Sequence, residues 1–201
     1  MVLMFGALLR APMTRLITPL SRGLLSMGIT ANMVTTTGAI GTIASSIYFF
    51  GTGKLFSGTI VITAFVLTDL LDGTMARLSE SGASKWGALL DSSLDRICDA
   101  AVMGALLYWI MNRHPNLVPV LLVALISSGL VSYIKARAES LDITCNGGLA
   151  ERTERLIILL VGTGLSGLGV SWALSLGIWT LAIAAVVTVL QRLQIVYKAT
   201  R

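Results

Sequence analysis

The chain has 201 residues, of which 55% are hydrophobic and only 12% charged, and its mean hydropathy is +0.83. A soluble domain carries about twice that share of charged residues, so the composition excludes an ordinary water-soluble globular protein. The net charge of +5 does not indicate a nucleic-acid partner, because recognition of nucleic acid requires a basic soluble surface that so apolar a chain does not offer. We therefore expect lipid to be the main solvent of this protein.

The N-terminal segment, residues 1–28, differs from the rest of the chain in its charge pattern. Arg10, Arg15 and Arg22 alternate with apolar residues, and the segment has neither a long apolar core nor a small-residue cleavage site. These features argue against a signal peptide. They favour an amphipathic juxtamembrane helix whose arginines face anionic headgroups, with a disordered tail as the alternative.

Residues 29–201 are predicted to form one transmembrane domain. Near-continuous apolar runs, each close to the ~20 residues that a bilayer-spanning helix needs, occur at roughly 30–50, 55–78, 86–112, 117–138, 155–171 and 173–197. The sequence therefore predicts an all-α integral membrane protein with six transmembrane helices.

The basic residues predict the orientation of these helices. With the N-terminus in the cytoplasm, thirteen lysines and arginines fall on the cytoplasmic side, and only Lys54 and Arg113 fall outside. Cytoplasmic loops retain Lys and Arg, so both termini are predicted to be cytoplasmic in a multi-pass protein of the cell membrane. All acidic residues map to the same half, which indicates where chemistry takes place.

Four aspartates surround the turn between the second and third predicted spans. Asp69 and Asp72 are three residues apart, and Asp91 and Asp95 are four apart, so each pair shares one helix face. The intervening Ser- and Gly-rich segment LSESGAS is typical of a turn. A short turn makes the two helices antiparallel neighbours, and we expect the four carboxylates to converge.

Carboxylates in a membrane helix require compensation. Each costs roughly 2.5–3.5 kcal/mol at the bilayer centre and less near the interface. Clustered negative charges also repel one another unless cations lie between them. Hard oxygen ligands suit Mg²⁺ or Mn²⁺, and four carboxylates suffice for two ions, an arrangement that clamps the attacking and leaving oxygens in phosphoryl displacement.

Small residues lie beside these acids. Gly73 and Ala76 leave space on the acidic face, and a glycine inside a helix costs ~1 kcal/mol relative to alanine. Room for a flat polar ligand such as a nucleotide is one explanation. Close helix packing, for which membrane helices often use small residues, is the other.

The aspartates and small residues together form a longer pattern. Asp69-x-x-Asp72-Gly73-x-x-Ala76-Arg77, nine residues, then Gly87-x-x-x-Asp91-x-x-x-Asp95, resembles the signature of the CDP-alcohol phosphotransferase family. The resemblance implies a six-helix fold, usually homodimeric, and two metal ions per subunit that hold the diphosphate of CDP-diacylglycerol. It also implies that Asp69, Asp72, Asp91 and Asp95 are metal ligands and that Asp95 is in addition the catalytic general base.

The resemblance extends to residues that contact the donor. Gly73 and Arg77 would contact the CDP group, and Ala76 would leave it room. Asn32 and Thr35 lie in a segment similar to the start of the family's first span, where Ala31 replaces the usual proline. Ser84, three residues before Gly87, is a further candidate donor contact.

Five basic residues are candidates for binding the acceptor. Several cations around one cavity suit a dianionic phosphate, so an acceptor that already carries phosphate fits better than serine or choline. The alternative is that these residues are only positive-inside anchors. The candidates follow the fourth span, open the fifth and lie at the end of the sixth: Lys135, Arg137, Arg152, Arg155 and Arg192.

Two phosphorylated acceptors are consistent with this pattern, inositol 1-phosphate and glycerol 3-phosphate. The segments SYIKARAES and NGGLAERTERLIILL resemble those of the actinobacterial branch of the family that uses inositol phosphate. The resemblance implies phosphatidylinositol phosphate and CMP as products. A rival of another class is a divalent-cation transporter, because intramembrane carboxylates often mark ion pathways. It would need polar groups in the outer half, where the sequence has no acid.

Overall fold

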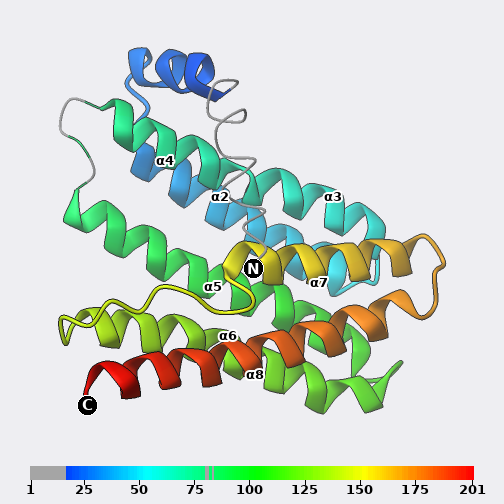
Figure 1. The fold of residues 1–201 in the computed structure, drawn as a ribbon. Coiled ribbons are helices and arrows are strands. Elements are labelled where there is room, and N and C mark those ends of the chain that lie inside the picture. Colours follow the sequence, from blue (N-terminus) through cyan, green and yellow to red (C-terminus); the bar gives the residue numbers. More distant parts are fainter. Residues whose placement is uncertain (1–16, 80–81, 83) are drawn as a thin grey trace.

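The computed structural model describes residues 17–79, 82 and 84–201, and that part of the chain is helical without any strand. Residues 17–26 form a helix. The longer helices that follow are α2 (Ala31–Ser45), α3 (Leu55–Val66), α4 (Thr68–Leu78), α5 (Lys85–Ile110), α6 (Val118–Glu139), α7 (Arg152–Gly167) and α8 (Ala173–Ala199) (Figure 1). A π-helical turn, Ser46–Phe50, extends α2, and a 3-10 turn, Pro115–Leu117, leads into α6.

Short polar side chains cap the N-termini of α2 and α5, two of the helices that surround the candidate site. The Thr30 hydroxyl accepts a hydrogen bond from the Met33 N–H at 3.3 Å before α2. The Ser84 hydroxyl accepts one from the Gly87 N–H at 2.9 Å before α5. Both are N-caps, which satisfy N–H groups that have no partner inside the helix.

Four helical segments are long and apolar enough to cross a membrane: Ala31–Phe50, Leu55–Leu78, Pro115–Glu139 and Ala173–Ala199. The other two predicted spans fall short by that measure. The apolar stretch of α5 is interrupted by Asp91, Asp95 and Asp99, and α7 has only 16 residues. Length and composition thus give four candidate membrane spans among the described residues, and the count of six stays a prediction.

The outer surface of the bundle is strongly apolar. Large hydrophobic side chains are exposed along several helices, including Ile40 (62%), Ile126 (62%), Ile183 (57%) and Leu190 (60%). Soluble monomers rarely expose apolar patches on this scale, so contact with lipid chains explains them.

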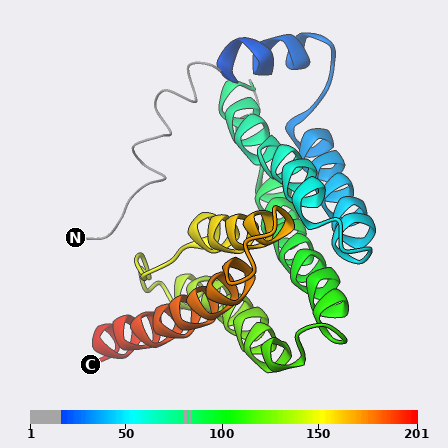
Figure 2. The ribbon, with the colours of Figure 1, turned by 90° about the vertical axis from the view of Figure 1, so that its right-hand side faces the viewer.

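The helices form two groups, which α5 and the packing of α3 against α7 connect (Figures 1 and 2). In one group α2 packs against α3 and α4, and in the other α8 packs against α6 and α7. The C-terminal half of α5 enters the shared core, where Val102, Leu106 and Ile110 are fully buried. Its N-terminal half, which carries the aspartates, lies outside that core and is available to a site.

The relation between α4 and α5 differs from the expected one. They run antiparallel (Figure 1), but α2 packs along both, and in the described chain they have little direct contact with each other. A side chain at Gly38 would collide with Thr68 of the α4 start, and a Cβ at Gly87 of α5 would lie 2.9 Å from Asn32 Oδ1. These glycines let α2 approach both helices, so the direct packing of α4 on α5 is replaced by a three-helix arrangement with an opening.

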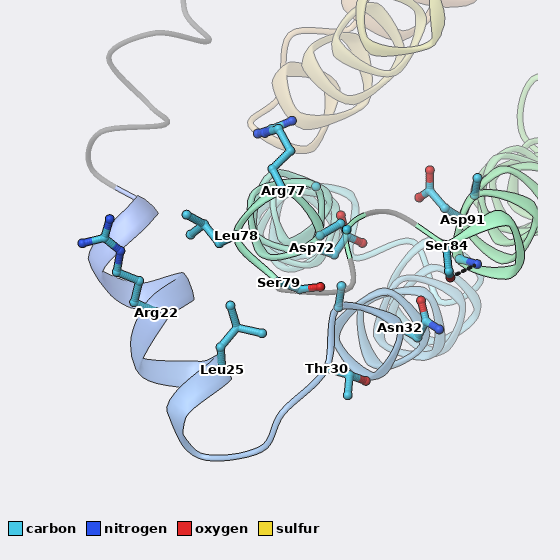
Figure 3. A pocket seen from close by; sticks show the side chains of 16 residues that line it. Arg22, Leu25, Thr30, Asn32, Asp72, Arg77, Leu78, Ser79, Ser84 and Asp91 are labelled. Atoms are coloured by element: carbon cyan, nitrogen blue, oxygen red, sulfur yellow. Dashed lines mark hydrogen bonds between the residues drawn. The ribbon is translucent and has the colours of Figure 1, made fainter.

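The predicted N-terminal segment is described only in its second half. Arg10 and Arg15 lie outside the described residues, whereas Arg22 is exposed on the helix formed by residues 17–26. That helix lies beside α4 (Figure 3). Its amphipathic character at a membrane surface stays a prediction.

Candidate active site between α2, α4 and α5

A cavity of about 1180 Å³ opens between the three helices. Asp72 of α4 and Asp91 of α5 lie beside it, with Asn32 of α2 between their helices (Figure 3). Five of the six predicted donor contacts line this cavity, namely Asn32, Gly73, Ala76, Arg77 and Ser84. The sequence pattern thus gathers around one polar space large enough for a nucleotide headgroup.

The sixth predicted donor contact, Thr35, lies deeper. Its side chain is buried, and its hydroxyl donates a 2.6 Å hydrogen bond to Asp72 Oδ2. A bond to a charged carboxylate is short and strong, and this one fixes α2 to α4. In the structure Thr35 orients an acidic side chain, and it does not line the large cavity.

The other two predicted metal ligands meet around an arginine. Arg152, the first residue of α7, places its Nη1 atom 2.7 Å from Asp69 Oδ2 and 2.8 Å from Asp95 Oδ1. Its Nε donates to Asp99 Oδ1 at 3.3 Å. One guanidinium therefore connects α4, α5 and α7 and offsets part of the negative charge.

The donor set suits a hard divalent cation in its chemistry. The candidate ligands are all carboxylate oxygens, and Asp72 is nearly buried, at 6% exposure, where an uncompensated charge is costly. Among the described residues, no three acidic, histidine or cysteine side chains come close enough to share one ion. The carboxylates lie in two pairs, with Asp72 and Asp91 at the cavity and Asp69 and Asp95 at Arg152.

The small residues of the motif have different surroundings. A Cβ added to Gly73 would meet only Arg77 Nη1, at 3.9 Å, so this face of α4 is open. A Cβ added to Gly87 would lie 2.9 Å from Asn32 Oδ1 and 3.1 Å from Ser84 Oγ. The ligand-space interpretation therefore fits Gly73, and close helix packing fits Gly87.

The predicted acceptor residues fall into a buried and an exposed set. Arg155 and Arg192 are each only 4% exposed. Arg155 Nη1 donates to the Ala150 carbonyl at 2.8 Å, and Arg192 donates to the carbonyls of Gly147 and Val131 at 3.0 and 2.6 Å. These bonds tie the segment before α7 to the helices that flank it.

The remaining predicted acceptor residues are near the end of α6. The Lys135 ammonium lies 4.0 Å from a Glu139 oxygen, and Arg137 Nη1 lies 3.2 Å from Ser140 Oγ. Exposed pairs of this kind contribute little to stability, which leaves these side chains adaptable. The structure thus brings Arg152 to the aspartates and leaves Lys135 and Arg137 at the surface.

Residues absent from the predicted site also take part in it. Asp99 is 7% exposed and pairs with Arg152, and Arg96 Nη2 lies 3.6 Å from both Asp95 and Asp99. The sequence does carry a signal for Asp99, because 91, 95 and 99 continue the same four-residue spacing along one helix face. Arg22 also lines the cavity, although its sequence context indicated only a membrane surface.

A helical membrane bundle with paired carboxylates beside a polar cavity defines a class of membrane-embedded transferase. The chain belongs to the CDP-alcohol phosphatidyltransferase family, which matches residues 28–191. It is therefore an enzyme of phospholipid biosynthesis, and the transporter alternative is set aside.

Individual relatives are similar over nearly the whole chain. The phosphatidylinositol phosphate synthase of Mycobacterium tuberculosis is 47% identical over 94% of this chain and 88% of its own length. That of Streptomyces avermitilis is 42% identical over 91% and 78%. These similarities agree with the resemblance inferred from the motifs.

Solved structures extend the comparison to the fold. The crystal structure of the M. tuberculosis enzyme with CDP-DAG bound matches with a TM-score of 0.86 at 46% identity, covering 91% of this chain and 94% of that one. Its complex with manganese and citrate matches with a TM-score of 0.85, also at 46% identity, covering 90% and 88%. The relative thus binds a divalent cation and the CDP-activated lipid.

Proposed function

We propose that this enzyme transfers the phosphatidyl group of CDP-diacylglycerol to inositol 1-phosphate, giving phosphatidylinositol phosphate and CMP. The observation that carries the proposal is the cavity between α2, α4 and α5, which residues of the family motif line. The fold around it matches that of a relative with CDP-DAG bound. At 46% identity the likeness supports a common reaction as well as a common fold.

The donor is proposed to lie in this cavity with its diphosphate toward the aspartates. Gly73 and Ala76 leave room for the cytidine, and Asn32, Arg77 and Ser84 supply polar contacts from three sides. Thr35 acts one step away, because it holds Asp72. Arg22, on the helix beside α4, adds a positive charge to the same wall.

Asp69, Asp72, Asp91 and Asp95 would hold the metal, proposed as two Mg²⁺ ions per subunit with Mn²⁺ able to replace them. Bound there, divalent ions would neutralise the diphosphate and the charge that develops on the leaving CMP. The four carboxylates lie in two pairs, Asp72 with Asp91 at the cavity and Asp69 with Asp95 at Arg152, which supports a two-ion arrangement.

Asp95 is proposed to act as general base. It accepts the proton of the inositol hydroxyl, whose oxygen attacks the phosphorus attached to the lipid. The bond from that phosphorus to the oxygen bridging to CMP breaks, and CMP leaves on the opposite side with the electron pair. Arg152, with Nη1 at 2.8 Å from Asp95 Oδ1, compensates part of the negative charge around the base.

The acceptor phosphate is proposed to bind to the cationic group made of Lys135, Arg137, Arg152, Arg155 and Arg192. A guanidinium has five N–H donors, so the carbonyl bonds of Arg155 and Arg192 leave others for phosphate while fixing the orientation of the side chain. Arg152 brings this group next to Asp95, where the hydroxyl must be placed.

The membrane arrangement is part of the same proposal. Each subunit would cross the cell membrane six times, and two subunits would form a homodimer. Both termini and the active site would lie on the cytoplasmic side, with residues 1–28 along the membrane surface. In support, α5 packs against α2 and α6, and α7 packs against α3 and α8, so both helices belong to the same bundle as the four apolar spans. A helix enclosed by others can cross the bilayer with more polar residues than a lone one.

The proposal is tested by CMP release from CDP-diacylglycerol by the purified enzyme in lipid nanodiscs. We expect CMP with inositol 1-phosphate and Mg²⁺ or Mn²⁺, and none after chelation by EDTA. Release with glycerol 3-phosphate but not with inositol 1-phosphate would contradict the acceptor assignment and leave the donor chemistry intact.

A further inference from the structure

Asp99 lies one helical turn beyond Asp95 and outside the family pattern. Its side chain is 10% exposed, compared with 19% for Asp95 and 34% for Asp69. A carboxylate this buried is stable only with good partners. It accepts a hydrogen bond from Arg152 Nε at 3.3 Å and lies 3.6 Å from Arg96 Nη2.

The guanidinium of Arg152 is thereby held from two sides. Asp99 binds its Nε, and Asp69 and Asp95 bind its Nη1. Because the guanidinium is planar and rigid, the bond at Nε fixes the plane of the group and the direction in which its outer nitrogens point. Without Asp99, only the Nη1 contacts would restrain the group, and it could rotate about them.

We infer that Asp99 is a positioning residue that orients Arg152 toward the acceptor phosphate beside Asp95. The inference rests on the proposed function, in which Arg152 binds that phosphate. The Asp99 carboxylate contacts Arg96 and Arg152, so it acts through Arg152. It also lies outside the motif whose four aspartates are the proposed metal ligands.

The experiment compares Asp99→Asn, Arg152→Gln and the double variant, with Asp142→Asn as the control. Asn has nearly the same shape as Asp but lacks its charge. Asp142 is exposed in the segment after α6, at a φ of 57° that asparagine also tolerates, so its variant tests loss of a carboxylate outside the site. Rates are measured against each substrate, and Mn²⁺ binding is measured separately by electron paramagnetic resonance.

For Asp99→Asn we expect the KM for inositol 1-phosphate to rise about tenfold, because a charge-assisted hydrogen bond is lost. The kcat, the KM for CDP-diacylglycerol and the Mn²⁺ affinity should stay within about threefold of wild type, the spread typical of neutral changes. The double variant should have the acceptor KM of Arg152→Gln alone, since both substitutions remove one interaction. Asp142→Asn should behave as wild type.

Additive effects in the double variant would overturn the inference, as would weaker Mn²⁺ binding or an equal loss of activity toward both substrates. If Asp99→Asn does not fold, Arg152→Gln decides, because a normal acceptor KM there overturns the orienting role. A wild-type enzyme that releases no CMP with inositol 1-phosphate would remove the proposed function itself. An active wild type with an unchanged Asp99→Asn variant would remove only the inference.

Discussion

The carboxylate side and the cationic side of the site differ in how their charges are compensated. On the carboxylate side, formed by α2, α4 and the first half of α5, acidic groups border an open cavity of about 1180 Å³. On the cationic side, formed by α6, α7 and α8, Arg155 and Arg192 are almost fully buried and donate to backbone carbonyls. Arg152 links the two sides directly, through its ion pairs with Asp69, Asp95 and Asp99.

The difference indicates which side depends on ligands. The carboxylates have few internal cations, so their charge must be balanced largely by what binds them. The buried arginines are already satisfied in part, so they stabilise the fold and bind phosphate with the donors that remain. Substitutions on the carboxylate side should therefore affect the reaction more than stability, and those on the cationic side should affect both.

The largest effect is expected for Asp95→Asn. Asparagine keeps the size of the side chain but cannot accept the proton of the hydroxyl, and removing a general base costs ~10²–10⁴-fold. We expect turnover to fall about 10³-fold while the melting temperature and CDP-diacylglycerol binding stay near wild type. CMP release and donor binding in nanodiscs are the measurements, and near wild-type turnover would exclude Asp95 as the base.

Gly73→Ala should have the next largest effect, and it should separate the reaction from the fold. The added methyl group meets only Arg77 Nη1 at 3.9 Å, so the protein tolerates it, and alanine gains up to ~1 kcal/mol of helix propensity. It projects toward the donor, so we expect the KM for CDP-diacylglycerol to rise about tenfold, as overpacking a tight contact does.

The matched control is Gly104→Ala in α5, where an added Cβ has no neighbour within 4 Å. We expect it to keep the wild-type donor KM. Equal donor KM values for the two alanine variants would show that the face of α4 at Gly73 does not contact the donor.

Arg192→Lys tests the cationic side. Lysine cannot reproduce both bonds to the Gly147 and Val131 carbonyls, at 3.0 and 2.6 Å, so at least one of these hydrogen bonds is lost. We expect unfolding to become easier by about 2 kcal/mol, together with a severalfold higher acceptor KM. Thermal unfolding in detergent and acceptor kinetics measure the two effects, and Arg113→Lys on an exposed turn is the control.

The carboxylate side could be predicted largely from the sequence, for a physical reason. Helical spacing alone places Asp69, Asp72, Gly73 and Ala76 on one face, and hydropathy identifies the apolar helices that carry them. The same argument, continued by one turn, would have included Asp99. Hydropathy was less informative for α5 and α7, because the charges of α5 and the short length of α7 remove the span signal.

The cationic side could not be predicted in the same way. The partners of Arg155 and Arg192 are backbone carbonyls, which every residue carries, so no side-chain pattern indicates them. Contacts between distant segments were equally hidden, such as the bond from Thr35 to Asp72 and the position of α2 between α4 and α5. These depend on how helices pack, and single-sequence periodicity does not report packing.

Lys135→Gln should have the smallest effect and completes the comparison within the cationic side. Lys135 is 41% exposed and its ion pair with Glu139 spans 4.0 Å, so its loss should change stability by less than about 1 kcal/mol. Lys135 is a flexible point charge near the proposed acceptor phosphate, so its replacement should raise the acceptor KM about threefold at low salt. The effect should be smaller at high salt, because ions screen an exposed charge. Lys54→Gln, on an exposed turn at the other end of the bundle, should leave KM unchanged. A loss of stability as large as that of Arg192→Lys would mean that exposed and buried cations serve the fold alike, and the contrast drawn between them would no longer hold.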